Sequence, residues 1–386
     1  MFIWSEWGGK VESREGSMRE ARHEVVVVGA GPAGGLAARR LAARGHDVVL
    51  IEASAEPHRP VACSGIIGRE AFDEMGLPTG STVSTVDRAR FISPSGARIT
   101  YEPREPMAFV VDRPSFDAAL ADRAVEAGAR LIRGCRATGI EKNRRGVTLA
   151  VRCEELDRIQ ARAVIIASGH RSRLNGPAGL GIPQANTVAV GVEYPFADLD
   201  AAEVYFGTGV APGFFAWAVP AGPGRARLGV LAASDPRGML ARFLEGEAIR
   251  SRMQSGSVAD CLCAAKGRTV VQGMVLPSYS DSVLAVGEAA GQVKTTTLGG
   301  IYYGMIGADI ASDVLSQGLL WNRIGARHLA RYEEAWTARL GDEIEMGLEL
   351  QRVAWGMSDP EIEAVFDTLS GGLAAAVQRV VRFDWH

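Results

Sequence analysis

One stretch near the start of the chain, His23 to Ala53, constrains the fold more than any other. Four consecutive valines, Val25–Val28, predict a strand that is buried on both faces, as strands of parallel sheets are. A loop with glycines at positions 29, 31 and 34 follows, then a helix-forming run over 36–44 and a second apolar strand over 48–51. This order predicts a βαβ unit, and with it an α/β fold built on a parallel sheet.

The loop inside this unit also carries a ligand signal. Its glycines have the spacing G-x-G-x-x-G between a strand and a helix, and an acidic residue follows at the end of the second strand. Such glycines let the backbone approach a pyrophosphate at a helix N-terminus, and the acid accepts hydrogen bonds from a ribose. We therefore predict a Rossmann-like dinucleotide site, with NAD and FAD both open at this point. The residues expected to contact the ligand are Gly29, Gly31, Pro32, Ala33, Gly34, Glu52 and Ala53.

A second glycine-rich segment, VGEAAGQVKTTTLGGIYYG at 286–304, bears on this choice. An extended FAD needs elements beyond the nucleotide fold to hold its ribityl chain and ring. An apolar strand over 283–286 leads into Gly287 and Glu288, where a carboxylate can meet ribityl hydroxyls, and the turn before Ile301 starts a helix. We therefore predict that the two segments hold the two ends of one FAD.

The remaining sequence predicts more than one layer. Segments 112–132, 162–169 and 282–291 read as further pieces of the parallel sheet, whereas 89–101 and 187–231 alternate apolar and polar residues with turns, as antiparallel strands do. After Ile301 the pattern is helical. The expected parts are an extension at 1–22, an FAD-binding domain of 23–85, 107–186 and 265–325, an antiparallel-sheet substrate domain of 86–106 and 187–264, and a helical C-terminal region at 326–386.

Composition excludes several classes of protein. The 42 lysines and arginines nearly balance the 45 aspartates and glutamates, so no net field attracts nucleic acid. The five cysteines are scattered, which argues against a disulfide framework and predicts no metal site. There is no signal-peptide pattern and no apolar run long enough to span a membrane. We expect a cytoplasmic protein, peripheral at the inner face of the membrane if segment 371–386 forms an amphipathic helix rather than docking on its own core.

Four segments, in order, resemble the geranylgeranyl reductase family within the p-hydroxybenzoate-hydroxylase-like flavoproteins. They are GAGPAGG with Glu52, PVACSGIIG at 60–68, FFAWAVP at 214–220 followed by Leu228-Gly-Val, and the 286–304 segment. The resemblance implies a glutathione-reductase-2-type FAD domain with an inserted antiparallel-sheet substrate domain and a helical C-terminal region. It also implies that reduced FAD delivers a hydride equivalent to a carbon–carbon double bond of a polyprenyl lipid, such as a geranylgeranyl lipid or a menaquinone side chain.

The same resemblance assigns residues to the site. Further FAD contacts fall on Ala62, Cys63, Ser64, Arg113, Ala167, Ser168, Gly169, Gly287, Glu288, Gly291, Gly299, Gly300 and Ile301. The substrate wall falls on Phe215, Trp217, Val219 and Pro220, and catalytic roles fall on Cys63, Tyr302 and Tyr303. Strand alternation puts Phe215, Trp217 and Val219 on one face and Phe214 on the other. A purely structural role stays open for the aromatic wall, for the thiol and for both tyrosines.

Several positions depart from the family pattern. Glu288 replaces an aspartate, Thr295 a proline and Leu298 a glycine, and the segment Ser168-Gly169-His170 lacks the usual acid. The aromatic signature has Phe215 in place of tyrosine and Val219 in place of phenylalanine. These are the positions where the flavin and substrate sites differ from the family.

Three questions stay open from sequence. Only one dinucleotide fingerprint is present, so the electrons come from transiently docked NADPH, from ferredoxin or from a quinol. The substrate is a polyprenyl lipid or a quinone. The rival functions are a flavin-dependent monooxygenase, which shares the fold and the first fingerprint, and a non-catalytic FAD-binding electron-transfer protein.

Overall fold

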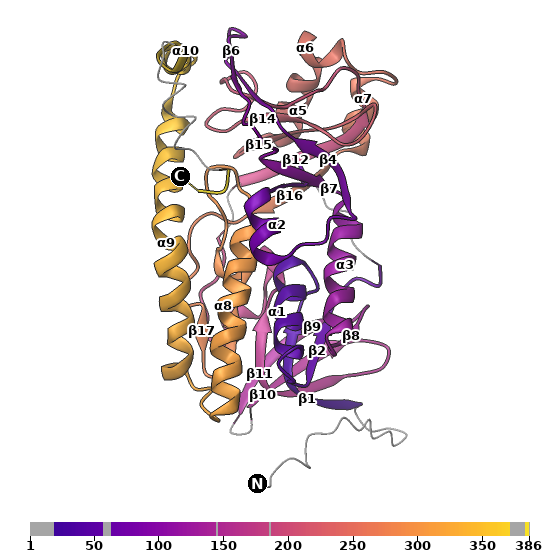
Figure 1. Cartoon of the computed structure of the whole chain (residues 1–386), viewed down its shortest axis with the longest axis vertical. Coiled ribbons are helices and arrows are strands. Elements are labelled where there is room, and N and C mark those ends of the chain that lie inside the picture. Colours follow the sequence, from indigo (N-terminus) through magenta and orange to yellow (C-terminus); the bar gives the residue numbers. More distant parts are fainter. Residues whose placement is uncertain (1–18, 57–62, 144–145, 185–186, 371–382, 386) are drawn as a thin grey trace.

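The computed structural model describes residues 19–56, 63–143, 146–184, 187–370 and 383–385. Figure 1 shows an elongated molecule in which a mixed sheet with its helices occupies one half and a second sheet the other. The long helix α9 (Ala326–Gly356) runs along one edge and reaches both halves.

The main sheet has the strand order β17-β18-β11-β1-β2-β8, and β9 and β10 extend it from β11. Strand β1 is parallel to both neighbours, pairing Val25 with Ala163 of β11 and with Val48 of β2. Val25, Val26 and Val27 have no exposed surface, which confirms the predicted strand buried on both faces. The strand bounds are β1 Glu20–Val28, β2 Val48–Ile51, β8 Arg130–Ile132, β9 Arg136–Asn143, β10 Gly146–Arg152, β11 Arg158–Ile166, β17 Tyr279–Ser280 and β18 Val283–Ala285.

Helices cover one face of this sheet and the hairpin of β9 and β10 lies toward the other. Helices α1 (Pro32–Ala42), α3 (Arg113–Glu126) and α8 (Ile301–Leu320) share one apolar core with the sheet. A second core lies on the opposite face, where Ile140, Val147 and Leu149 pack with the helix α4 (Asn175–Ala178). The predicted helices of the βαβ unit and of segment 112–132 are thus confirmed.

The second sheet has the order β16-β12-β15-β14-β13-β5-β6. Its neighbouring strands are antiparallel except for β13 and β5, which are parallel, so the expected antiparallel sheet is in fact mixed. Strand β16 pairs with β12 and carries this sheet past residue 264, where the substrate domain was expected to end. The bounds are β5 Ala89–Ile92, β6 Arg98–Tyr101, β12 Thr187–Pro195, β13 Ala202–Tyr205, β14 Ala216–Pro220, β15 Arg225–Ala232 and β16 Lys266–Val270.

A three-stranded sheet lies between the two halves (Figure 1). Its order is β3-β7-β4, with bounds Ile66–Gly68, Ala108–Val111 and Thr82–Val86. The other helices are α2 Arg69–Met75, α5 Pro236–Glu245, α6 Glu247–Arg250 and α7 Val258–Ala264, and the two short 3₁₀ turns are η1 Gly169–Arg171 and η2 Gly287–Ala290.

The C-terminal region is helical over its described residues up to Thr368, through α9 and α10 (Asp359–Thr368). Ser358 and Glu361 form a capping box that starts α10 immediately after α9 ends. The amphipathic helix expected over 371–386 lies almost wholly outside the described residues. Within the described ranges, no helix combines the length and apolarity that crossing a membrane requires.

Candidate functional site

The first glycine loop is shaped by close approach of backbone. A Cβ on Gly29 would lie 2.5 Å from the carbonyl oxygen of Ala167, and one on Gly34 would lie 1.9 Å from that of Gly29. A Cβ on Gly31, in contrast, would meet no atom within 4 Å. Two glycines therefore let β1, α1 and β11 pack together, while the third faces open space at the start of α1.

That open space is suited to an anion. No side chain of the described residues caps the N-terminus of α1. The backbone N–H groups of its first turn are therefore available as hydrogen-bond donors to a ligand. Glu52 stands beside the loop at the end of β2, where its carboxylate accepts hydrogen bonds from the backbone of Ala30 and Ser54, each at 2.9 Å. This is where a pyrophosphate and a ribose would be held.

The two glycine-rich segments meet in space although they are far apart in sequence. A Cβ on Gly287 would lie 3.3 Å from the Cβ of Ala33, and one on Gly304 would lie 3.0 Å from the Cα of Gly287. Helix α8 starts after Gly300 and, like α1, has no side-chain cap among the described residues. Two open helix N-termini therefore border one site, which fits an extended cofactor with polar groups at both ends.

The carboxylate of Glu288 lies at this site and interacts with two other residues. Its carboxylate forms an ion pair with Arg268 of β16 and lies 3.3 Å from both the backbone nitrogen and the Nδ1 of His170. Burial opposes ionisation, but the hydrogen bond of His170 and the charge of Arg268 outweigh it and lower the pKa of Glu288 to about 2. His170 lies in the segment that lacks the family acid, so it supplies a partner to the longer glutamate.

Sequence reasoning missed Arg268, because its role depends on β16 joining the second sheet. The sequence did contain an indication of His170, because this residue follows the predicted contacts Ser168 and Gly169 in a motif that departs from the family. A Cβ on Gly169 would lie 3.6 Å from the Glu288 carboxylate, so these predicted residues are brought together.

Cys63 contacts one arginine and lies near the charge of another. Its sulfur accepts hydrogen bonds from Nη1 of Arg113 and from the backbone of Gly65, both at 3.4 Å. Burial raises the pKa of the Cys63 thiol, but the charges of Arg113 and Arg268 more than offset this and lower it. Arg113 is itself held by Asp117 at 3.0 and 2.9 Å. The thiol is therefore in an electropositive setting that favours the thiolate. Ser64 adjoins it, and Ala62 and the start of its segment lie outside the described residues.

The two tyrosines of α8 are bound elsewhere. The Tyr302 hydroxyl donates a hydrogen bond to Glu74 of α2, and the Tyr303 hydroxyl donates one to the backbone carbonyl of Asp384 at 3.0 Å. The Trp385 ring packs against both, with centroids 5.9 and 5.8 Å away. Burial, and for Tyr302 also Glu74, raises the pKa of each phenol. Their hydroxyls join the first turn of α8 to α2 and to the end of the chain.

Leu298, which replaces a glycine of the family pattern, has a strained backbone conformation. Leu298 has φ of +56°, in the left-handed region that favours glycine, which is the family residue at this position. Gly291 needs its glycine for a different reason, because a Cβ there would lie 2.1 Å from the carbonyl oxygen of Gly273. The loop is closed by a hydrogen bond from the backbone of Lys294 to Gly299 at 3.0 Å.

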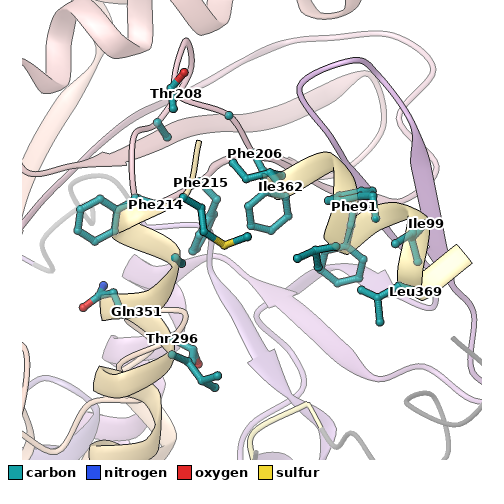
Figure 2. A pocket seen from close by; sticks show the side chains of 18 of the residues that line it. Phe91, Ile99, Phe206, Thr208, Phe214, Phe215, Thr296, Gln351, Ile362 and Leu369 are labelled. Atoms are coloured by element: carbon teal, nitrogen blue, oxygen red, sulfur yellow. The ribbon is translucent and has the colours of Figure 1, made fainter. Parts of the chain in front are cut away.

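An apolar cavity of about 500 Å³ lies between the second sheet and the C-terminal helices (Figure 2). Aromatic and aliphatic side chains from β5, β6, the loop before β14, α9 and α10 form its wall. They include Phe91, Ile99, Phe206, Phe214, Phe215, Leu350, Ile362, Val365, Phe366 and Leu369. Thr296, from the second glycine segment, lies at its wall, so the cavity adjoins the expected flavin site.

Only some of the residues predicted to form the aromatic substrate wall line this cavity. Strand β14 begins at Ala216, so Phe214 and Phe215 precede it and both line the cavity, contrary to the expected alternation. Trp217 and Val219 lie in the buried cluster behind it, and Pro220 is not among the lining residues. Trp217 lies across Gly229, where a Cβ would be 2.2 Å from its ring.

Comparisons with known proteins agree with this geometry. The family model described as lycopene cyclase protein matches residues 24–357. The chain is 31% identical over 376 residues to digeranylgeranylglycerophospholipid reductase 2 of Methanothermobacter thermautotrophicus, covering 93% of this chain and 94% of the relative. It is 32% identical over 373 residues to digeranylgeranylglycerophospholipid reductase of Methanocaldococcus jannaschii, covering 92% and 93%.

A solved structure confirms the fold class. The geranylgeranyl bacteriochlorophyll reductase-like protein of Thermoplasma acidophilum superposes with a TM-score of 0.85 at 22% identity, covering 94% of this chain and 97% of its own. Its fold has the predicted flavoprotein architecture. The chain therefore belongs to the family that the lycopene cyclase protein model describes and, within it, to the geranylgeranyl reductases, which are FAD-dependent oxidoreductases.

Proposed function

We propose that this protein is an FAD-dependent reductase that saturates carbon–carbon double bonds of a polyprenyl lipid. The observation that carries the proposal is the apolar cavity, which adjoins the second glycine segment at Thr296. Its volume lies in the range of ligand pockets, and aliphatic and aromatic side chains dominate its wall. A geranylgeranyl lipid and a menaquinone side chain share this chemistry, and both remain candidates.

The reaction explains why such a cavity is needed. Bound FAD, once reduced, would supply the hydride equivalent that adds to one alkene carbon. An isolated alkene is a poor hydride acceptor, so the protein must exclude water and hold the chain in register. Phe214 and Phe215 wall the cavity near β14, and Leu350 and Ile362 close it from the helices. These residues position the double bond and keep the site dry.

We assign the residues of the flavin site as follows. The loop of Gly29–Gly34 and Glu52 would hold the pyrophosphate and ribose, and the turn around Gly287 and Gly300 would hold the ribityl chain and ring. Cys63 is the candidate to act at the flavin as a thiolate, because its sulfur accepts a hydrogen bond from Arg113 at 3.4 Å and the charges of Arg113 and Arg268 lower its pKa. Tyr302 and Tyr303 are proposed to position the first turn of α8.

The cavity also indicates how the lipid enters. Met346, Leu350 and Val353 form an exposed apolar stripe on α9, with exposed fractions of 53%, 47% and 67%, and Val365 of α10 is 43% exposed. Leu350 and Val365 line the cavity as well, so this stripe is continuous with its wall. We propose that this face contacts the membrane that supplies the lipid.

The test is an anaerobic single turnover. The holoenzyme is photoreduced, mixed with a geranylgeranyl phospholipid in detergent, and followed by flavin absorbance and by mass spectrometry of the lipid. A lipid gaining two hydrogen atoms as the flavin reoxidises supports the proposal. Repeating the mixing in air with labelled dioxygen tests the rival, since incorporated oxygen would indicate a monooxygenase. No change in the lipid under either condition would favour an electron-transfer protein.

The electron donor is a separate question. We propose transient NADPH or reduced ferredoxin, because the sequence carries a single dinucleotide fingerprint. Anaerobic flavin reduction with NADPH, with reduced ferredoxin and with a quinol would distinguish the three sources.

A further inference from the structure

Two cysteines that the proposed function does not use lie opposite each other. Strands β9 and β10 are antiparallel, and their last pairs are Val151 with Ala137 and Arg152 with Arg136. One further step of this register places Cys153 opposite Cys135, directly beyond the ends of both strands. Directly opposed residues of an antiparallel pair have Cα atoms about 4.5–5.5 Å apart, within the roughly 4.4–6.8 Å that a disulfide spans.

The side chains agree with this register. Both contact the same apolar core on this face of the sheet, so they point to the same side. The two thiols are close enough to interact with each other, and both cysteines are reduced. Cys135 is only 1% exposed, whereas Cys153 is half-buried and reaches solvent. Burial and the neighbouring Cys153 raise the pKa of Cys135 to about 12. An oxidant from solvent therefore meets Cys153 first, with a protonated partner thiol beside it.

We propose that Cys135 and Cys153 form a reversible disulfide when the enzyme meets hydrogen peroxide. The Cys153 thiol gives up its proton, the thiolate attacks one peroxide oxygen, the O–O bond breaks, and the hydroxide that leaves takes up that proton, so a sulfenic acid and one water form. The sulfur of Cys135 then displaces the hydroxyl group of the sulfenic acid, its own proton leaves, and a second water is released. The two thiols lose two electrons in total and the peroxide gains them. A dithiol reverses the step by exchange.

The position of the pair suggests what the disulfide controls. The backbone N–H of Cys135 donates a hydrogen bond to the carbonyl of Glu52 at 2.8 Å, and the carboxylate of Glu52 holds the glycine loop through Ala30 at 2.9 Å. A disulfide would tie β10 to the strand end that carries Glu52. Oxidation is therefore expected to slow release of FAD, whichever lipid is the substrate. Reduced flavin that reacts with dioxygen forms hydrogen peroxide, so the oxidant can arise at this enzyme itself.

The first test maps the bond. Full-length holoenzyme is treated with equimolar hydrogen peroxide, alkylated without reduction and digested with trypsin. The expected product is the peptide Gly134–Arg136 linked to the peptide Cys153–Arg158, lighter than their sum by two hydrogen atoms and separated by dithiothreitol. The link is expected in Cys263→Ser, whose altered cysteine is exposed elsewhere, and absent in Cys153→Ser and in Cys135→Ala. Recovery of both peptides unlinked, as alkylated or over-oxidised cysteines, would overturn the proposal.

The second test measures the link to the cofactor. Release of FAD on dilution is followed by the rise of flavin fluorescence in oxidised and reduced holoenzyme. We expect release at least twofold slower after oxidation, with no difference in Cys153→Ser. If FAD is released at equal rates from reduced and oxidised holoenzyme, in a sample whose disulfide has been mapped, the proposal that the disulfide controls FAD release is overturned.

Discussion

The ion pair of Glu288 with Arg268 is expected to make the free energy of unfolding depend on pH, and replacing Glu288 tests this. The pKa of Glu288 falls from the ordinary value of 4.5 to about 2 because His170 and Arg268 favour the carboxylate more than burial disfavours it. A shift of this size corresponds to about 3 kcal/mol of native-state stability at neutral pH. Its side chain is only 15% exposed, so solvent screens the interaction weakly.

The sign follows from the direction of the shift. A carboxyl whose pKa is lowered by folding contributes fully above its unfolded-state pKa, and this contribution is lost as the pH falls through the folded-state value. We therefore expect Glu288→Gln to be less stable than the wild type by up to about 3 kcal/mol near pH 7, with the difference shrinking progressively below about pH 5.

The assay is urea unfolding of both proteins without FAD, followed by circular dichroism at several pH values. Glu193→Gln is the matched control, because Glu193 pairs with Arg225 and Arg227 but its side chain is 38% exposed. Exposed pairs contribute about 0–1 kcal/mol, so this control is expected to change little. A difference between wild type and Glu288→Gln that stays constant from about pH 7 to about pH 3 would refute the reasoning.

Three further predictions concern the loop, the cavity and the apolar stripe. Gly34→Ala is expected to prevent stable folding or FAD binding, because its Cβ would lie 1.9 Å from the Gly29 carbonyl oxygen. Gly31→Ala is expected to keep the fold, because its Cβ would meet no atom within 4 Å. Thermal unfolding of both variants checks this difference. Phe366→Ala is expected to lose about 3–5 kcal/mol in urea unfolding, because the ring is 6% exposed in the cavity wall. Val353→Asp is expected to reduce co-sedimentation with phosphatidylcholine vesicles severalfold and to leave turnover of detergent-dispersed lipid unchanged, because Val353 does not line the cavity.

Each of these predictions has a contradicting result. Normal folding and flavin content in Gly34→Ala would mean that the loop differs from its described geometry. Unchanged stability of Phe366→Ala would mean that α10 does not pack on the cavity, and equal vesicle binding by Val353→Asp would remove the stripe as the contact face.

Local patterns in the sequence predicted most of the fold. The valines of β1, the glycines at 29 and 34 and the start of α8 were predictable because their signals depend on neighbouring residues. The glycine loops were predicted to serve one cofactor, and the structure brings them together at Ala33 and Gly287.

The rest depended on contacts between distant segments. Arg268 reaches Glu288 only because β16 joins the second sheet, and Ile362 and Phe366 reach the cavity only because α10 lies at the same cavity as β5 and β6. The expected alternation around Phe215 was wrong because it assumed a strand from residue 214, whereas the chain enters β14 two residues later.

The central claim is that the apolar cavity delivers a prenyl chain to the flavin, and filling the cavity tests it most directly. Ala354 lines the cavity and is exposed, so a larger side chain can enter the space without disturbing a buried core. The measurement is anaerobic reoxidation of photoreduced Ala354→Trp holoenzyme by a geranylgeranyl lipid, with ferricyanide as the small acceptor. The account predicts that reoxidation by the lipid slows more than tenfold while reoxidation by ferricyanide keeps its rate. Equal slowing by both acceptors, or unchanged reoxidation by the lipid, would contradict it.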